Sequence, residues 1–218
     1  MNINEFIGSY HNHPILFIGT GISLRYLSNS YSWDGLLEKI STDLTGDNEF
    51  FYNVKGECFS DGKFSYDQIA AKVESAFNHS LKEDRTGKFS HINDIFFENM
   101  KNGINTSRFK IYIAQLLSSL EYREEMKEEL STFKKARKNI SSIVTTNYDT
   151  LVEDIFQFKP LIGNDILLSN PYGSVYKIHG CVTDASKIII TDERAITHVW
   201  CSFCCNWPNQ TIAPRTNI

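Results

Sequence analysis

The sequence lacks the features expected of a secreted, membrane-spanning or nucleic-acid-binding protein. Its 218 residues contain only five cysteines, an odd number that does not suit a disulfide framework. The segment MNINEFIGSYHNHPILFIG has no basic region, and its apolar run is too short to span a bilayer. The formal net charge is -4, whereas nucleic-acid binders are usually basic. We therefore expect a cytoplasmic protein with reduced thiols and a small-molecule ligand, and neither a membrane nor a nucleic acid as partner.

Internal repeats and low-complexity tracts are also absent, and short apolar runs mark the expected strands. PILFIG, SIVTT and VYKIHG each precede a polar or glycine-containing segment, which is typical of buried parallel strands. These runs predict strands at Ile15 to Ile18, Ile143 to Thr145 and Val175 to Ile178, with a fourth at Lys187 to Thr191. Because parallel strands end at one edge of a sheet, the three segments that follow these runs should share a nucleotide-binding crevice.

Helical patterns fill most of the remaining sequence. SLRYLSNSYSW is polar and mixed, so we expect a mobile loop there, followed by a helix that begins near Trp33 with Ser32 as its N-cap. The apolar stripe of that helix is expected to pack on the sheet. Residues from about 46 to 139 read as successive amphipathic helices, with Ser65 and Gln68 resembling a capping box. A short helix is expected from about Thr150.

The predicted fold class is therefore α/β, with a Rossmann-like parallel sheet that a helical insertion at about 46–139 interrupts. We assign residues 1–194 to one domain and residues 195–218 to an atypical C-terminal tail. The tail holds three of the five cysteines and has no usable period. Either it is a local element of its own, or the sheet is incomplete on its C-terminal side.

The turn GTGIS follows the first predicted strand. Gly19 and Gly21 permit a tight turn and close approach of the backbone to a pyrophosphate, and the hydroxyl of Ser23 suits a phosphate or a ribose. Glycines after a strand are also common as simple turn residues, so this motif alone is weak. The third spaced glycine of the dinucleotide fingerprint is absent, which argues against an ordinary nicotinamide dehydrogenase.

The segments TTNYD and HG stand at the ends of the apolar runs SIVTT and VYKIHG. Asn147 both donates and accepts hydrogen bonds, which suits orientation of a ribose hydroxyl or of a water near an anomeric carbon, and Thr146 and Asp149 add polar groups. Alternatively, Asn147 or Asp149 merely caps the helix that follows. His179 titrates in a range suited to proton transfer, although a single histidine is more often a structural group.

Taken together and in this order, GTGIS, TTNYD and HG resemble the motifs of the sirtuin superfamily, in which a GAG-I-S-type turn, a T-x-N-x-D segment and an H-G pair recur. The resemblance covers Pro14 to Asn29 and Ile140 to Asp192, and Thr20 in place of alanine is the one departure within the first motif. It implies NAD as the substrate and His179 as a catalytic residue beside Asn147. The cofactor-binding residues that we predict are Gly19, Thr20, Gly21, Ser23, Thr146, Asp149 and Gly180.

Two departures from the sirtuin deacylases distinguish this sequence. The first motif is not followed by a G-I-P-D-F-R-type loop, and the cysteine cluster Cys201, Cys204 and Cys205 has only one C-x-x-C pair rather than the two of a zinc ribbon. We therefore expect no structural zinc. The segments SWDGLL and NPYGSVYKIHGCVTD look like those of the zinc-free, sirtuin-like NAD-consuming modules of bacterial antiphage defence proteins.

The resemblance implies an NAD glycohydrolase that cleaves NAD to nicotinamide and ADP-ribose in antiviral defence. In such a reaction Asn147 would hold the water or a ribose hydroxyl, His179 would accept a proton or orient the ribose, and Asp149 would stabilise charge. Such an enzyme must be restrained until it is triggered, which implies a homo-oligomer or a regulatory partner. Two alternatives stay open, namely an NAD-dependent protein deacylase and a non-catalytic nucleotide-binding or assembly module with an incomplete sheet.

Overall fold

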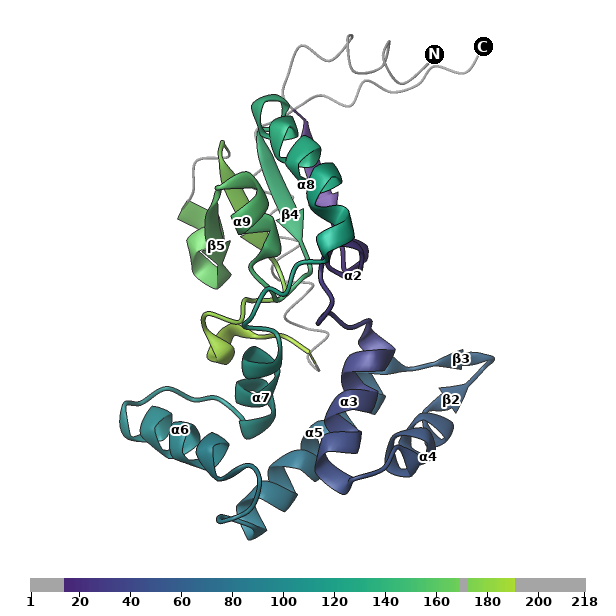
Figure 1. Ribbon diagram of the computed structural model, residues 1–218. Coiled ribbons are helices and arrows are strands. Elements are labelled where there is room, and N and C mark those ends of the chain that lie inside the picture. The colour runs from purple at the N-terminus through teal and green to yellow at the C-terminus, as the bar shows by residue number, and fades with distance from the viewer. Residues whose placement is uncertain (1–13, 169–171, 191–218) are drawn as a thin grey trace, which may run out of the picture.

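The protein has an α/β fold built on a four-stranded parallel sheet, shown in Figure 1. The computed structural model describes residues 14–168 and 172–190. The spatial order is β1, β4, β6, β5, and the strands are β1 (Ile15–Ile18), β4 (Ser142–Thr145), β5 (Lys159–Ile162) and β6 (Ser174–Lys177). The Rossmann-like sheet predicted from the sequence is confirmed.

The strand register aligns the carboxyl ends of all four strands. Ile18 lies beside Thr145, Thr145 beside Lys177, and Lys177 beside Ile162. Each strand is parallel to its neighbours, so the segments that follow β1, β4 and β6 leave the sheet along one edge. The prediction that the three motif segments share an edge is therefore confirmed.

One face of the sheet packs against helices α8 (Lys127–Lys134) and α9 (Leu151–Phe156). Strand residues Ile143 and Val175 are fully buried in this layer, together with Phe156 of α9. The alternate residues of β4 and β6, Val144 and Tyr176, belong to a smaller cluster on the opposite face. This alternation is the period-two pattern that a strand imposes on its side chains.

The helices between residues 33 and 116, with a short hairpin, form a second half of the molecule, which lies near the carboxyl edge of the sheet (Figure 1). Its apolar core includes the fully buried rings of Phe51, Phe77 and Phe109. The elements of this half are α3 (Trp33–Thr45), α4 (Glu49–Glu57), the hairpin β2 (Phe59–Ser60) and β3 (Lys63–Phe64), α5 (Tyr66–Glu83), α6 (Ser90–Lys101) and α7 (Arg108–Leu116). The predicted helical character of the insertion is confirmed.

Short 3-10 helices complete the described elements. They are η1 (Glu124–Met126) and η2 (Lys135–Asn139) on either side of α8, η3 (Gly163–Leu168) after β5, and η4 (Ala185–Lys187) after β6. Across residues 14–168 and 172–190, no helix has the length and apolarity that a membrane crossing needs.

Two predictions about the N-terminal part were wrong. The segment expected to be a mobile loop contains helix α2 (Gly21–Tyr26), which is held in place because Tyr26 is buried and Arg25 forms an ion pair with Glu129 of α8. Helix α3 begins as predicted, with the Ser32 hydroxyl accepting a hydrogen bond from the Gly35 amide. Its apolar stripe, however, packs in the helical core with α4 and α5 instead of on the sheet.

Two further local predictions also failed. Ser65 is the N-cap residue of α5, but its hydroxyl donates to Asp67 and caps no backbone amide, so the predicted capping box is absent at this helix. The strand expected from Lys187 is not formed through Ile190. Ile188 and Ile190 are instead buried in the helical core, which explains why the sequence is apolar there.

Candidate functional site

The three motif segments meet at the carboxyl edge of the sheet. Gly19 to Gly21 follow β1, Thr146 and Asn147 follow β4, and His179 lies just beyond β6. Strands β1, β4 and β6 are neighbours in that order, so the segment from β4 is the middle one. The structure thus brings together residues that are separated by more than 120 positions in the sequence, as the Ser23–Asp149 hydrogen bond shows.

Asn147 connects the first two motif segments. Its Nδ2 donates to the carbonyl oxygen of Gly19 at 3.2 Å and to the hydroxyl of Ser23 at 3.0 Å. Because a carbonyl oxygen only accepts, these bonds fix which side of the amide is nitrogen. Asn147 Oδ1 is consequently the free end of the side chain. It is buried and has no partner within the described residues, so an acceptor is available to a bound ligand.

Asp149 joins the same network from the other side. Its Oδ2 accepts a 2.7 Å hydrogen bond from the Ser23 hydroxyl, and its Oδ1 accepts one from the Leu151 amide at 3.0 Å. The second bond satisfies the first amide of α9, although Thr150 is the N-cap residue, so Asp149 supports the start of the helix from one position before its cap. Asn147 does not, because its side chain is directed to β1 and α2. Both carboxylate oxygens of Asp149 thus accept hydrogen bonds from the protein, whereas Oδ1 of Asn147 has no partner among the described residues.

His179 lies beside the middle segment, with its ring centroid 6.4 Å from that of Tyr148. Burial lowers the pKa of His179 below its ordinary value of 6.5, because a charged imidazolium is poorly solvated there. The imidazole is therefore neutral at neutral pH. Its Nδ1 is buried and has no hydrogen-bond partner in the described part of the chain. A neutral ring with an unpartnered nitrogen is suited to accept a proton.

The predicted glycines fall into two physical groups. A Cβ placed on Gly19 or Gly21 would meet nothing within 4 Å, so packing does not require glycine at either position. The open space above them would admit a ligand close to the backbone. Gly180 differs, because its φ is +88° and a Cβ there would lie 2.2 Å from the Lys187 carbonyl oxygen. The fold itself requires glycine at that position.

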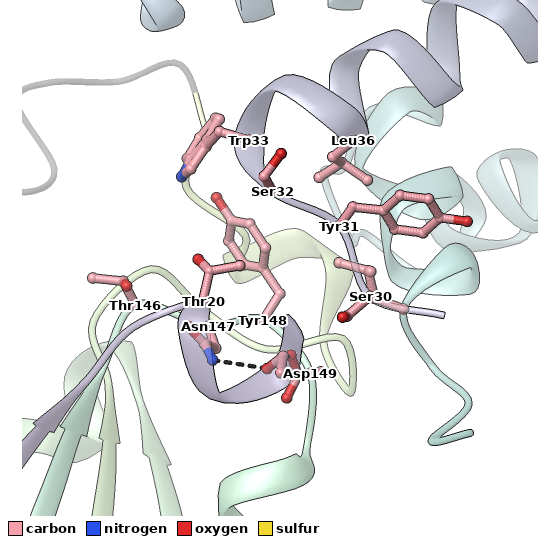
Figure 2. Close-up of a pocket in the computed structure, with 12 residues that line it drawn as sticks. Thr20, Ser30, Tyr31, Ser32, Trp33, Leu36, Thr146, Asn147, Tyr148 and Asp149 are labelled. Carbon is pink, nitrogen blue, oxygen red and sulfur yellow. Dashed lines mark hydrogen bonds between the residues drawn. The ribbon is translucent and has the colours of Figure 1, made fainter. Parts of the chain in front are cut away.

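A small cavity with a volume of about 40 Å³ opens between the sheet edge and the start of α3 (Figure 2). This volume is well below the roughly 300–1,000 Å³ that is usual for ligand pockets. Five predicted site residues line it, whereas Gly19, Gly21, His179 and Gly180 do not. The complete lining is Thr20, Ser23, Ser30, Tyr31, Ser32, Trp33, Leu36, Leu117, Thr146, Asn147, Tyr148 and Asp149.

Sequence reasoning missed the aromatic part of this cavity. Trp33 and Tyr148 meet edge to face with their ring centroids 6.4 Å apart, and both line the cavity that Figure 2 shows. The Tyr148 hydroxyl donates to the Ile189 carbonyl at 2.8 Å, and burial raises the pKa of this phenol. Tyr148 lies inside the TTNYD motif, between two residues that were singled out, so its position was the available signal.

A buried ion pair under the cavity was also missed. The ammonium of Lys177 pairs with Glu153 of α9, with Nζ and Oε1 2.9 Å apart, and its side chain is fully buried. Lys177 also donates to the backbone carbonyl of Asp149. The positive charge of Lys177 and the negative charge of Glu153 offset each other. The net charge of Lys177, Glu153 and Asp149 is therefore the single negative charge of Asp149, which lines the cavity. A carboxylate placed there favours a positively charged ligand group.

The structure describes only part of the chain in which metal ligands could lie. Within the described ranges, no three histidine, cysteine, aspartate or glutamate side chains are grouped as metal ligands would be. Cys201, Cys204 and Cys205 lie outside those ranges. The absence of zinc therefore stays a prediction.

Residues 141–203 match the model of a SIR2-like domain in a comparison with protein families. The matched segment begins at β4 and contains TTNYD and HG, and it covers less than half of the chain. No curated protein matches the chain. The match supports the resemblance to the sirtuin superfamily, and a SIR2-like domain indicates an NAD-related function. It does not extend to the GTGIS turn, to α2 or to the helical half.

Proposed function

We propose that this protein is an NAD glycohydrolase, which uses water to cleave the bond between nicotinamide and ribose. The observation that supports this most directly is the network at the sheet edge, which leaves the buried Oδ1 of Asn147 without a partner next to a cavity lined by the Asp149 carboxylate. A ligand with both a hydroxyl donor and a cationic centre would satisfy both groups. The nicotinamide ribose of NAD has both.

Residues that line the cavity, together with His179 just beyond β6, suit each part of this reaction. As the bond from the ribose carbon to the ring nitrogen breaks, nicotinamide leaves as a neutral molecule with the bonding electron pair, and positive charge develops on the ribose. The Asp149 carboxylate would stabilise that charge. Asn147 Oδ1 would accept a hydrogen bond from a ribose hydroxyl or from the attacking water. His179, which is neutral, would take the proton that the water loses as it bonds to the ribose carbon.

The open backbone at Gly19 and Gly21 suits another part of the same substrate. A Cβ added at either position would have no other atom within 4 Å, so the turn after β1 leaves room for a pyrophosphate to approach the backbone. Thr20 and Ser23 line the cavity beside it. The motif resemblance leads us to propose bacterial antiviral defence as the biological setting, with NAD depletion held in check by self-association or a partner.

The test is to incubate the purified protein with NAD and to separate nicotinamide and ADP-ribose by chromatography. We expect the wild-type protein to form both products in equal amounts. Asn147→Ala should reduce kcat by about 100-fold or more, since loss of one positioned polar group commonly costs that much. Asn102→Ala is the matched control, because Asn102 is exposed at the end of α6, far from the motif segments in the sequence.

Two results would contradict the proposed reaction, and a third would contradict its proposed site. If folded wild-type protein forms no nicotinamide in any oligomeric state that is tested, the protein is not a glycohydrolase. Formation of O-acyl-ADP-ribose from an acylated peptide, in place of ADP-ribose, would assign the chemistry to a deacylase. Equal activity in Asn147→Ala and Asn102→Ala would show that the activity resides elsewhere.

A further inference from the structure

Lysine is seldom fully buried, and the burial of Lys177 at the end of β6 has no explanation in the packing of the sheet. Its side chain has 0% relative exposure and lies on the face that α9 covers. Burying an ammonium group is costly unless it is paired and hydrogen-bonded. Here one partner is the carboxylate of Glu153 and the other is the main-chain carbonyl of Asp149. An apolar side chain would fill such a position without that cost.

The hydrogen bonds that begin at Lys177 lead step by step to the cavity. Lys177 holds the carbonyl of Asp149, whose carboxylate accepts from Ser23, and Ser23 in turn accepts from Asn147. Asn147 also donates to the Gly19 carbonyl. The four side chains of Lys177, Asp149, Ser23 and Asn147 are all at least nine-tenths buried. One continuous polar network therefore connects β6, the segment after β4 and the turn after β1.

We propose that Lys177 is a positioning residue, which fixes the backbone of Asp149 and through it the orientation of the Ser23 hydroxyl and the Asn147 amide. Lys177 itself does not line the cavity, so it acts without touching the substrate. Glu153 pairs with the Lys177 ammonium, which donates to the Asp149 carbonyl. The inference rests on the proposed function where it concerns turnover, and on the hydrogen-bond network alone where it concerns structure.

The first variants separate the hydrogen bond from the charge. Lys177→Met removes both, and the double variant Lys177→Met with Glu153→Gln removes the bond but restores the single net negative charge of the site. We expect kcat to fall by about 100-fold in both, because small displacements of catalytic groups have effects of that size, while KM changes little. Lys72→Met with Glu57→Gln is the matched control, since that ion pair joins two exposed side chains on α5 and α4.

Recovery of wild-type kcat in the double variant would overturn the proposal, because charge balance alone would then explain Lys177. If Lys177→Met does not fold, the double variant still answers the question, since it leaves no unpaired carboxylate at the site. Unchanged kcat in a folded double variant has the same meaning as recovery.

A second readout does not depend on activity. The Leu151 amide donates to Asp149 Oδ1, so its hydrogen exchange reports how firmly Asp149 is held. We expect exchange at Leu151 to rise about tenfold in the double variant, the equivalent of one hydrogen bond, while amides of β1 keep their protection. Unchanged exchange would overturn the proposal. If the wild-type protein forms no nicotinamide, the proposed function fails, and the exchange experiment still decides the role of Lys177.

Discussion

The two halves of the molecule bury different kinds of side chain. The helical half has a core of aromatic and aliphatic residues, in which Phe77 packs against Phe89, Phe109 and Tyr112 with ring centroids 5.1 to 6.0 Å apart. The edge of the sheet instead buries a lysine, an aspartate, an asparagine and a serine that are linked by hydrogen bonds. Apolar burial stabilises a fold, whereas a buried polar network mainly fixes positions.

The halves are joined at several places, and one of them is the site itself. The chain passes between them in two adjacent segments, where the Ser28 amide donates to the Glu121 carbonyl at 2.8 Å and Asn29 donates to the Ser119 carbonyl. The segment after β6 also enters the helical core. Tyr148 is a further connection, because its ring belongs to the helical core while its neighbours Asn147 and Asp149 belong to the sheet edge. A change in the helical half therefore has a direct route to the cavity.

Truncating the helical core should give the largest effect on stability. Phe77→Ala leaves a cavity at a fully buried position, and we expect a loss of about 3–5 kcal/mol in the free energy of unfolding. Chemical denaturation followed by circular dichroism measures this change. Phe59→Ala is the matched control, because Phe59 is 51% exposed and its main contact is the Phe64 ring, worth about 1 kcal/mol. Similar losses for the two variants would contradict the assignment of the core.

The glycines at the sheet edge allow stability and binding to be separated. Gly180→Ala should destabilise the protein by about 2 kcal/mol or more, because of its positive φ and the clash with the Lys187 carbonyl. Gly21→Ala should be neutral or stabilise it by up to about 1 kcal/mol, because the added methyl meets open space in the first turn of α2.

The Gly21→Ala variant also tests the prediction that Gly21 binds NAD. If NAD approaches the turn after β1, then Gly21→Ala weakens NAD binding although the protein is no less stable, and titration calorimetry would measure the weaker affinity. A Gly21→Ala protein with wild-type affinity would remove Gly21 from the predicted set.

The sheet edge was predictable because each motif follows an apolar run of strand length. Strand β5 escaped prediction because KPLI contains a proline and has two exposed residues, which an edge strand tolerates. Helix α2 was missed for another reason. Its sequence, GISLRY, is short and mixed, and the burial of Tyr26 and the pairing of Arg25 with Glu129 depend on α8, more than 100 positions away.

Lys177 shows what sequence reasoning cannot supply. A lysine in a strand is ordinarily assigned to a solvated position, since charged residues are rarely buried without a partner. The partner, Glu153, lies on α9, and only the packing of that helix on β6 brings the two together. The motif residues were found because their types are chemically distinctive, whereas the groups that hold them depend on tertiary contacts.

The smallest expected effect concerns the pH dependence at His179. Its pKa is lowered by burial, so the unfolded chain takes up a proton there at a higher pH than the folded protein does. Stability from this group is therefore complete above pH 6.5, the unfolded value, and is lost as the pH falls. Between pH 8 and pH 5 the free energy of unfolding should fall less in His179→Gln than in the wild-type protein. His79→Gln, an exposed site on α5, should behave as the wild type does. If His179 also accepts the proton in turnover, kcat/KM declines with a midpoint below 6.5, and an acid limb centred above that value would assign the proton to another group.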